Sequence, residues 1–234
     1  MKNKVLIIIP AYNEEENIQW VIEELKEKVP TYDYVVVNDG SKDGTARICY
    51  ENAYPMLDLP ANFGLSAAVL SGMRFAVEQG YDMAVQYDGD GQHCPEYIHM
   101  LEKAVAENGA DVAIGSRFLE KDKPMTARML GSRLISFCIL LTTGKRLTDP
   151  TSGMRMYSKE IMELFISNPN YRPEPDSISY LLYNGVNVQE CQVDMRERVA
   201  GQSYLSFFKS MKYMIQTIFS ILLTQGIRGK GKQA

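Results

Sequence analysis

The feature that most constrains the fold is the alternation of short β-type runs with longer helical runs through the first half of the chain. The β-type runs are rich in Val, Ile, Met and Ala and have the length of buried strands. The expected strands are 4–9, 33–38, 56–59, 82–87 and 111–115, and the expected helices are 13–29, 43–52, 64–79 and 95–108. Alternation at this spacing is typical of βαβ units, so we predict an α/β protein with a mainly parallel, twisted sheet flanked by helices.

The second half is less regular and shows no internal repeat and no low-complexity linker. Its pattern favours helices over 126–141, 159–166 and 175–183 and strands over 154–157 and 186–193. At the other end of the chain, Asn13 and Glu16 have the spacing of a capping box, which predicts that the first helix begins there. We expect one domain over 1–203, followed by an amphipathic helix and basic tail over 204–234.

Composition excludes several classes of protein. The chain has 234 residues, of which 45% are hydrophobic and 23% charged, so it can bury a sizeable core and is neither disordered nor a disulfide scaffold. Its four cysteines are scattered without a Cys-x-x-Cys pair, which argues against a zinc site and favours buried thiols in a reducing cytosol. We expect no signal peptide, since only five apolar residues follow Lys4, and no membrane-spanning helix.

Charge is unevenly distributed along the chain. The formal net charge is −4, but residues 196–234 hold seven Lys or Arg and one acid, a balance of +6 against −10 elsewhere. This basic end indicates an anionic partner, either nucleic acid or an anionic membrane surface. One helical stripe of this segment is apolar, with polar residues opposite, as in an interfacial helix. The stripe comprises Phe208, Met211, Ile215, Ile218, Phe219 and Leu222, and the polar side comprises Lys209, Gln216, Thr217 and Ser220. Packing on the body or on a second copy is the alternative.

Ligands of parallel α/β sheets bind beyond the carboxyl ends of the strands, so the loops 10–14, 39–44, 59–65, 88–93 and 115–123 should converge. Asp88 and Asp90 follow a strand directly, and two carboxylates at this spacing suit Mg²⁺ or Mn²⁺. Gln92 or His93 could complete the ligand shell. The alternative is a solvated acidic turn, with His93 shaping the loop.

Other polar residues near these strand ends suit a nucleotide. Asp39 can accept hydrogen bonds from a ribose or a base, or it can form an Asx-turn. Tyr12 can stack on a base and Glu14 can bind a ribose, although both positions also suit the start of a helix. Arginine at strand ends suits bidentate phosphate recognition, and Arg117 lies just past the strand 111–115. Arg128 and Arg133 lie on or near the next helix, and Arg196 and Arg198 precede 201–203. Solvated surface arginines are the alternative. The chain has neither a P-loop nor a Gly-x-Gly-x-x-Gly after its first strand.

Together these motifs resemble the family 2 glycosyltransferases. The first two motifs are IPAYNEEENI at 9–18 and VNDGSKDGT at 37–45. The acidic motif DGDGQH at 88–93 resembles the form found in the polyprenyl-phosphate branch, typified by dolichyl-phosphate mannose synthase. So do GSR at 115–117, DPTSGMR at 149–155 and RERVAGQS at 196–203.

The resemblance implies a GT-A fold and inverting transfer of a sugar from a UDP- or GDP-linked donor to a polyprenyl (undecaprenyl or dolichyl) phosphate. By the family's pattern, the nucleoside is held by Pro10, Tyr12, Glu14 and Asp39. Mg²⁺ or Mn²⁺ is held by Asp88, Asp90 and Gln92. The donor and acceptor phosphates are handled by Arg117, Arg128, Ser132 and Arg198. Asp90, Arg117 and Arg198 are the expected catalytic residues.

The sequence also departs from the family pattern. Asn38 replaces an Asp, the segment 62–67 lacks a lysine, and Tyr204 replaces a lysine, so the base and the sugar stay open. An alternative function is glycan elongation onto a sugar hydroxyl, which requires a base, for which Glu174 and Asp176 are the candidates. Both also suit capping of the helix 175–183. A third alternative is a non-catalytic nucleotide-sugar or lipid-binding module.

These patterns also give expectations for partners and location. We expect a cytoplasmic enzyme, peripheral on the inner face of the cell membrane, with membrane contact through residues 204–232. No nucleic acid partner is expected, and homo-oligomerisation stays open.

Overall fold

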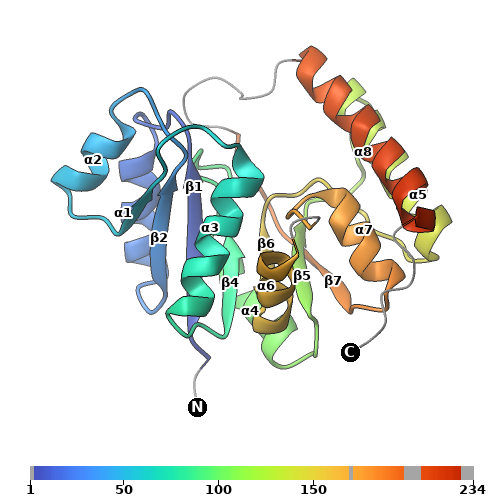
Figure 1. Cartoon of the computed structure of the whole chain (residues 1–234), viewed down its shortest axis with the longest axis horizontal. Coiled ribbons are helices and arrows are strands. Elements are labelled where there is room, and N and C mark those ends of the chain that lie inside the picture. Colours follow the sequence, from blue (N-terminus) through green and yellow to red (C-terminus); the bar gives the residue numbers. More distant parts are fainter. Residues whose placement is uncertain (1–2, 169–170, 198–206, 228–234) are drawn as a thin grey trace.

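A seven-stranded sheet forms the middle layer of the computed structural model, which describes residues 3–168, 171–197 and 207–227 (Figure 1). The strands are β1 Val5–Ala11, β2 Asp33–Asn38, β3 Met56–Asp58, β4 Met83–Gln86, β5 Val112–Ser116, β6 Arg155–Ser158 and β7 Val188–Gln192. Their order is β3-β2-β1-β4-β6-β5-β7. Strand β6 runs antiparallel to β4 and β5, and the other four pairings are parallel, which confirms the predicted mainly parallel sheet.

Helices cover both faces of the sheet. They are α1 Ile18–Lys28, α2 Thr45–Glu51, α3 Leu65–Glu78, α4 Ile98–Ala106, α5 Ala127–Thr143, α6 Lys159–Ser167, α7 Pro175–Tyr183 and α8 Phe207–Ile227, with a 3-10 turn at Pro95–Tyr97 before α4. The predicted start of the first helix is wrong. Asn13 has a φ of +56°, outside the helical region, and its Oδ1 accepts a hydrogen bond from the Lys42 N–H (2.8 Å). The residue links two loops instead of capping a helix.

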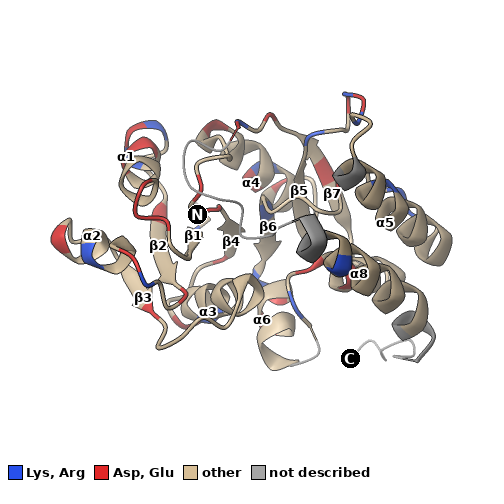
Figure 2. Ribbon diagram, turned by 90° about the horizontal axis from the view of Figure 1, so that it is seen from above, with Lys and Arg blue, Asp and Glu red and all other residues tan. Residues whose placement is uncertain are grey.

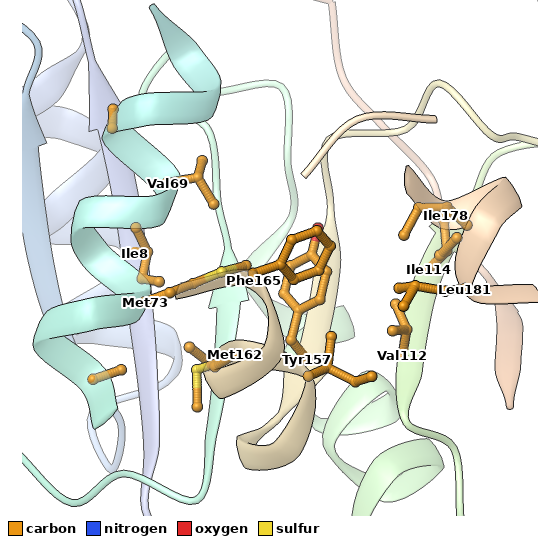
Figure 3. Packing of buried hydrophobic residues seen from close by; sticks show 14 of the residues in the cluster. Ile8, Val69, Met73, Val112, Ile114, Tyr157, Met162, Phe165, Ile178 and Leu181 are labelled. Atoms are coloured by element: carbon orange, nitrogen blue, oxygen red, sulfur yellow. The ribbon is translucent and has the colours of Figure 1, made fainter. Parts of the chain in front are cut away.

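The sheet is buried on both faces because its strands alternate between two cores. In β1, Leu6 and Ile8 face the core shared with α3, α5, α6, α7 and α8, while Val5, Ile7 and Ile9 face the core under α1 and α4. Figure 3 shows the first core, where side chains of β1, α3 and α6 pack together. Strands covered by helices on both sides carry continuous apolar runs, which is why 4–9 was recognisable as a strand. The loops at the carboxyl ends of these strands therefore extend from a sheet that is buried on both faces.

Helix α8 packs against α5 and α7 (Figure 1). A Cβ atom at Gly131 of α5 would overlap the Met214 side chain of α8, so the glycine permits the close approach. Thr217 is buried, and Ser220 donates a hydrogen bond to Asp176 Oδ2 (2.7 Å). Of the side of α8 predicted to be polar, Thr217 and Ser220 therefore face the body while Gln216 is exposed, and the predicted apolar stripe is exposed at Met211, Ile215, Phe219 and Leu222. Among the described helices, none has the length and apolarity needed to cross a membrane.

Candidate active site

The loops after β1 and β2 are tied together by hydrogen bonds between their motifs. The Asn13 N–H donates to Ser41 Oγ (3.0 Å), and the Glu14 N–H donates to Thr45 Oγ1 (2.9 Å). The main-chain oxygen of Glu14 accepts from the N–H of Ile18, the first residue of α1. Both motifs therefore present their side chains at one edge of the sheet, as predicted.

A pocket of about 140 Å³ lies at this edge. Six residues predicted from the sequence to bind the donor or the metal line it together: Pro10, Tyr12, Glu14, Asp39, Asp88 and Asp90. Ala11, Gly89 and two residues of α3, Leu65 and Ala68, complete the wall. The pocket thus combines two carboxylates with the side chains expected to hold a nucleoside.

Asp39 supports the pocket as well as lining it. Its side chain is buried, and its two carboxylate oxygens accept hydrogen bonds from the Phe63 and Gly64 N–H groups, both at 2.8 Å. These bonds fix the segment that leads into α3. Each oxygen keeps a second lone pair, so Asp39 can still accept a hydrogen bond from a ligand.

Asn38, the departure from the family pattern, has a local explanation. Its Oδ1 accepts from the Ser41 N–H (3.2 Å), which is the turn bond considered for Asp39. Its Nδ2 donates to Asp58 Oδ1 (2.7 Å) on the neighbouring strand. An Asp at this position would place a second carboxylate against Asp58, whereas the amide makes a hydrogen bond.

His93 shapes the loop that carries the two acids. It is 2% exposed, and its Nδ1 accepts a hydrogen bond from the Asp88 N–H (3.0 Å). Nε2 therefore carries the proton in the neutral ring, and it lies 3.7 Å from Asp88 Oδ2. The Tyr87 hydroxyl donates to the His93 main-chain oxygen (2.6 Å). These bonds favour the loop-shaping interpretation of His93.

The chemistry of the donor set fits Mg²⁺ or Mn²⁺. Asp88 and Asp90 line the same pocket, and Gln92 follows them in the loop. Gln86 Nε2 donates to Asp88 Oδ1 (2.8 Å), and the Gln92 N–H donates to Asp90 Oδ1 (3.1 Å), so both carboxylates are oriented. Within the described ranges, no three His, Cys, Asp or Glu side chains form a closed metal cage. A hard cation held by two carboxylates completes its shell with phosphate and water.

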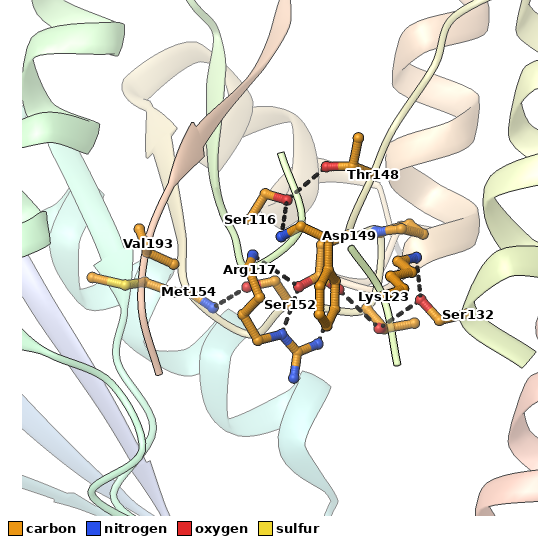
Figure 4. A network of polar contacts seen from close by, with 12 residues as sticks. Ser116, Arg117, Lys123, Ser132, Thr148, Asp149, Ser152, Met154 and Val193 are labelled. Atoms are coloured by element: carbon orange, nitrogen blue, oxygen red, sulfur yellow. Dashed lines mark hydrogen bonds and ion pairs between the residues drawn. The ribbon is translucent and has the colours of Figure 1, made fainter. Parts of the chain in front are cut away.

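Arg117, expected to bind phosphate, is held by a buried acid. Its Nε and Nη2 donate to the two oxygens of Asp149 at 2.6 and 2.9 Å (Figure 4), and Asp149 is 0% exposed. The loop that carries Asp149 also reaches the acidic motif, since a Cβ at Gly153 would lie 2.5 Å from Asp88 Oδ2. Because β6 is antiparallel, this loop before it lies at the same edge as the ends of β4 and β5.

Lys123 is a further cation at this edge, and the sequence analysis missed it. Its Nζ donates to Ser132 Oγ (3.0 Å, Figure 4), and Ser132 is buried. Burial lowers the pKa of Lys123, and Arg117 and Arg133 lower it further, against the opposite effect of Asp149 and Glu190. Neither Lys123 nor Arg133 forms an ion pair with any described residue. The absence of acids from 123–148 was the available signal.

The structure describes the remaining predicted arginines to different extents. Arg128 is in the first turn of α5, but its side chain is not described, and Arg198 lies outside the described residues. Arg196 is described, and its guanidinium is bound to Glu24 on α1.

The two candidate bases form hydrogen bonds to hydroxyls. Glu174 Oε1 accepts from Ser66 Oγ (2.7 Å), and Asp176 Oδ2 accepts from Ser220. Glu174 occupies the N-cap position of α7, but its side chain makes no capping bond. Each acid thus connects α7 to another helix, α3 or α8.

Residues 6–165, more than half of the chain, match the family model described as "Glycosyl transferase family 2". The protein belongs to glycosyltransferase family 2. It is therefore a transferase, as the motifs and the pocket indicated.

Sequence similarity to named relatives extends over nearly the whole of this glycosyltransferase. It is 30% identical to polyprenol monophosphomannose synthase of Mycolicibacterium smegmatis, over 97% of this chain and 88% of that protein. It is 33% identical to undecaprenyl-phosphate mannosyltransferase of Micrococcus luteus, over 87% of this chain and 88% of that protein. These similarities agree with the polyprenyl-phosphate branch named from the motifs.

Solved structures identify the fold. Glucosyl-3-phosphoglycerate synthase from Mycobacterium tuberculosis, in complex with phosphoglyceric acid, matches with a TM-score of 0.68 at 19% identity, over 94% of this chain and 80% of that one. The same enzyme in complex with Mn²⁺, uridine diphosphate and glucosyl-3-phosphoglycerate matches with a TM-score of 0.63 at 19% identity, over 95% and 80%. The predicted GT-A fold is confirmed.

Proposed function

We propose that this glycosyltransferase transfers a sugar, with inversion and with a divalent metal ion, from a UDP- or GDP-linked donor to a polyprenyl phosphate such as undecaprenyl or dolichyl phosphate. The relatives that act on polyprenol and undecaprenyl phosphate support the acceptor. The observation that carries the proposal is the half-buried Lys123, a cation without a carboxylate partner among the described residues, beside Ser132 and Arg117.

The donor would occupy the pocket at the ends of β1, β2 and β4. Tyr12 would stack on the base, Glu14 and Asp39 would accept hydrogen bonds from the nucleoside, and Pro10 would shape the wall. Asp88, Asp90 and Gln92 would hold Mg²⁺ or Mn²⁺. When bound, the ion offsets the negative charge that develops on the leaving nucleoside diphosphate.

The acceptor phosphate would bind where cations gather at the other side of the same edge. A half-buried ammonium without a counter-ion is unfavourable, and an anionic ligand would relieve this cost. Lys123 and Ser132 would each donate a hydrogen bond to a phosphate oxygen, and Arg117 would add its free guanidinium donors. By the family resemblance, Arg128 and Arg198 join them.

A phosphate acceptor needs no general base, because it is already anionic near neutral pH, with a second pKa of about 6. A sugar hydroxyl, in contrast, must lose a proton as it attacks. The two candidate bases, Glu174 and Asp176, accept hydrogen bonds that connect α7 to α3 and α8. These bonds give both acids a positional role and favour the phosphate over glycan elongation.

The paired helices α5 and α8 would bind the membrane that holds such a lipid. Each exposes an apolar stripe, with Phe137 60% and Phe219 59% exposed. The exposed residues of α5 are Leu130, Leu134, Phe137, Leu140 and Leu141, and those of α8 are Met211, Ile215, Phe219, Leu222 and Leu223. We therefore extend the proposed membrane contact from residues 204–232 to α5.

Charge distinguishes a membrane from a second copy as the partner of this two-helix face. The segments 123–148 and 206–234, which contain α5 and α8, hold ten Lys or Arg and no acid, so the rest of the chain carries −14. The α5 and α8 ribbons of Figure 2 accordingly contain blue positions and no red ones. Two such faces repel each other, whereas an anionic bilayer attracts each basic residue by about 1 kcal/mol.

Incubation of the protein with a panel of UDP- and GDP-sugars, Mn²⁺ and short polyprenyl phosphates tests the proposal. We expect one donor to give a lipid product whose mass increases by one sugar, with loss of product in EDTA. A free oligosaccharide offered in place of the lipid should stay unmodified. Transfer to the oligosaccharide alone would contradict the proposed acceptor.

A further inference from the structure

Gln92, the last proposed metal ligand, is tied to a residue 104 positions away. The main-chain N–H of Arg196 donates to the main-chain oxygen of Gln92 (2.9 Å), and the side-chain Nε2 of Gln92 donates to the main-chain oxygen of Arg196 (3.3 Å). Because the carboxamide nitrogen points at Arg196, its oxygen points the other way. That oxygen is the only atom of the side chain that can bind a hard cation.

Arg196 is in turn held by helix α1. Its Nη1 and Nη2 donate to the two carboxylate oxygens of Glu24 at 2.9 and 2.8 Å, and its guanidinium lies 5.6 Å from the Trp20 ring centre. Trp20 and Glu24 are four residues apart, so they share one face of α1. A bidentate pair, with an aromatic ring over the guanidinium, favours one orientation of this planar group.

Trp20 also supports the acidic loop directly. A Cβ atom at Gly91 would lie 2.5 Å from the indole Cζ3, so the main chain of Gly91 rests on the ring. Gly91 has a φ of +76°, which favours glycine for a second reason. The turn between Asp90 and Gln92 therefore has a rigid aromatic support.

We propose that Trp20, Glu24 and Arg196 are positioning residues that hold the loop 88–93 ready to bind the metal before the metal arrives. The inference rests on the proposed function in that this loop is the metal site. It assigns Arg196 a role distinct from phosphate binding. It also gives α1, which contributes no side chain to the pocket, a part in the reaction.

Trp20 is the only tryptophan of the chain, so its fluorescence reports on this contact. We would titrate the full-length protein with Mn²⁺ and with Mg²⁺, alone and with UDP or GDP, following Trp20 fluorescence and free Mn²⁺ by electron paramagnetic resonance. The wild type should show a saturable fluorescence change with both metals. Glu24→Gln and Arg196→Lys should weaken Mn²⁺ binding about 10-fold or more, the usual effect of losing a group that orients a ligand.

Glu27→Gln, an exposed change on the same helix, is the matched control and should bind Mn²⁺ like the wild type. Trp20→Phe, followed by resonance alone, is a second test if Glu24→Gln does not fold by circular dichroism, and it should also weaken binding. Mn²⁺ affinity that is equal in the folded variants and the wild type would overturn the inference.

The two proposals fail differently. A wild type that binds no Mn²⁺ would contradict the proposed metal site itself. Intact metal binding without transfer to polyprenyl phosphate would contradict the proposed function and leave the positioning role standing.

Discussion

At the scale of single residues, the two cations of the proposed acceptor side, Arg117 and Lys123, are held in different ways. Arg117 is bound to a buried carboxylate, whereas Lys123 Nζ has the Ser132 hydroxyl as its hydrogen-bond partner and lies 5.5 Å from the Phe118 ring centre. The first arrangement fixes a donor in place, and the second leaves a charge to be neutralised by a ligand. Each makes a separate prediction.

Asp149→Asn should destabilise the protein, because it leaves the Arg117 guanidinium without its counter-charge. We expect the free energy of unfolding to fall by about 1–3 kcal/mol, measured by urea denaturation. Asp194→Asn is the control, since its pair with Lys121 is exposed, and it should leave the midpoint unchanged. Equal midpoints for Asp149→Asn and the wild type would contradict the structural role of the pair.

Lys123→Met should reduce kcat/KM for the lipid phosphate about 10- to 100-fold, as expected for the loss of one charge-assisted hydrogen bond. Its effect on stability depends on pH. The pKa of Lys123 is lower in the folded protein than in the unfolded chain, so between these two values the unfolded chain binds an extra proton. The free energy of unfolding of the wild type therefore increases as the pH rises from the lower to the higher of these two pKa values.

Lys123→Met lacks this pH-dependent increase in stability. At pH 7 it should be at least as stable as the wild type, and the difference in stability should decrease as the pH approaches 10. Thermal unfolding across that pH range measures the effect. A difference between the two proteins that does not depend on pH would contradict a lowered pKa at Lys123.

The residues that line the pocket could be predicted from the sequence, whereas the residues that hold them in place could not. Asp88, Asp90, Asp39 and Glu14 each follow a strand within a recognisable motif, so their side chains could be placed at one edge. Asp149, Glu24 and Trp20 act through contacts with distant parts of the chain, and Lys123 acts through a contact with Ser132, nine residues away. No spacing in the sequence indicates such contacts.

At the scale of elements, periodicity located the helices but not always the face that each one buries. In α8 the larger apolar stripe is the exposed one, while Met214, Thr217 and Ile221 face α5 and α7. The close approach at Gly131 makes this packing possible. A helix with apolar residues on both sides can bury either side against the body, and the hydrophobic pattern alone does not indicate which one.

Phe137→Glu on α5 should weaken binding to vesicles of phosphatidylglycerol and phosphatidylcholine about 10-fold or more, since a buried Phe contributes about 1.5–3 kcal/mol. Sedimentation with vesicles measures the effect, and added salt should weaken binding of the wild type as well. Tyr50→Glu on α2, where the side chain is also exposed, is the control and should bind like the wild type. Equal loss in both variants, or none in Phe137→Glu, would contradict the two-helix face.

At the scale of the whole molecule, the sheet topology explains why distant motifs meet. Alternation of strands and helices predicted the parallel half, β3-β2-β1-β4. The antiparallel insertion of β6 between β4 and β5 was not indicated, because the short run 154–157 carries no sign of strand direction. That insertion brings the loop 148–153 between the acidic motif and Arg117, and so joins the proposed donor and acceptor sides.

Calorimetric titration of UDP and GDP into the wild type and Asp90→Asn, with Mn²⁺ and with EDTA, measures whether a metal ion holds the nucleotide in this pocket. We expect one nucleotide to bind the wild type with Mn²⁺, and EDTA or Asp90→Asn each to weaken binding at least about tenfold, 1.4 kcal/mol. Circular dichroism should show that the variant is folded. Nucleotide binding that is equally tight in EDTA and in folded Asp90→Asn would contradict a metal-held diphosphate at this site.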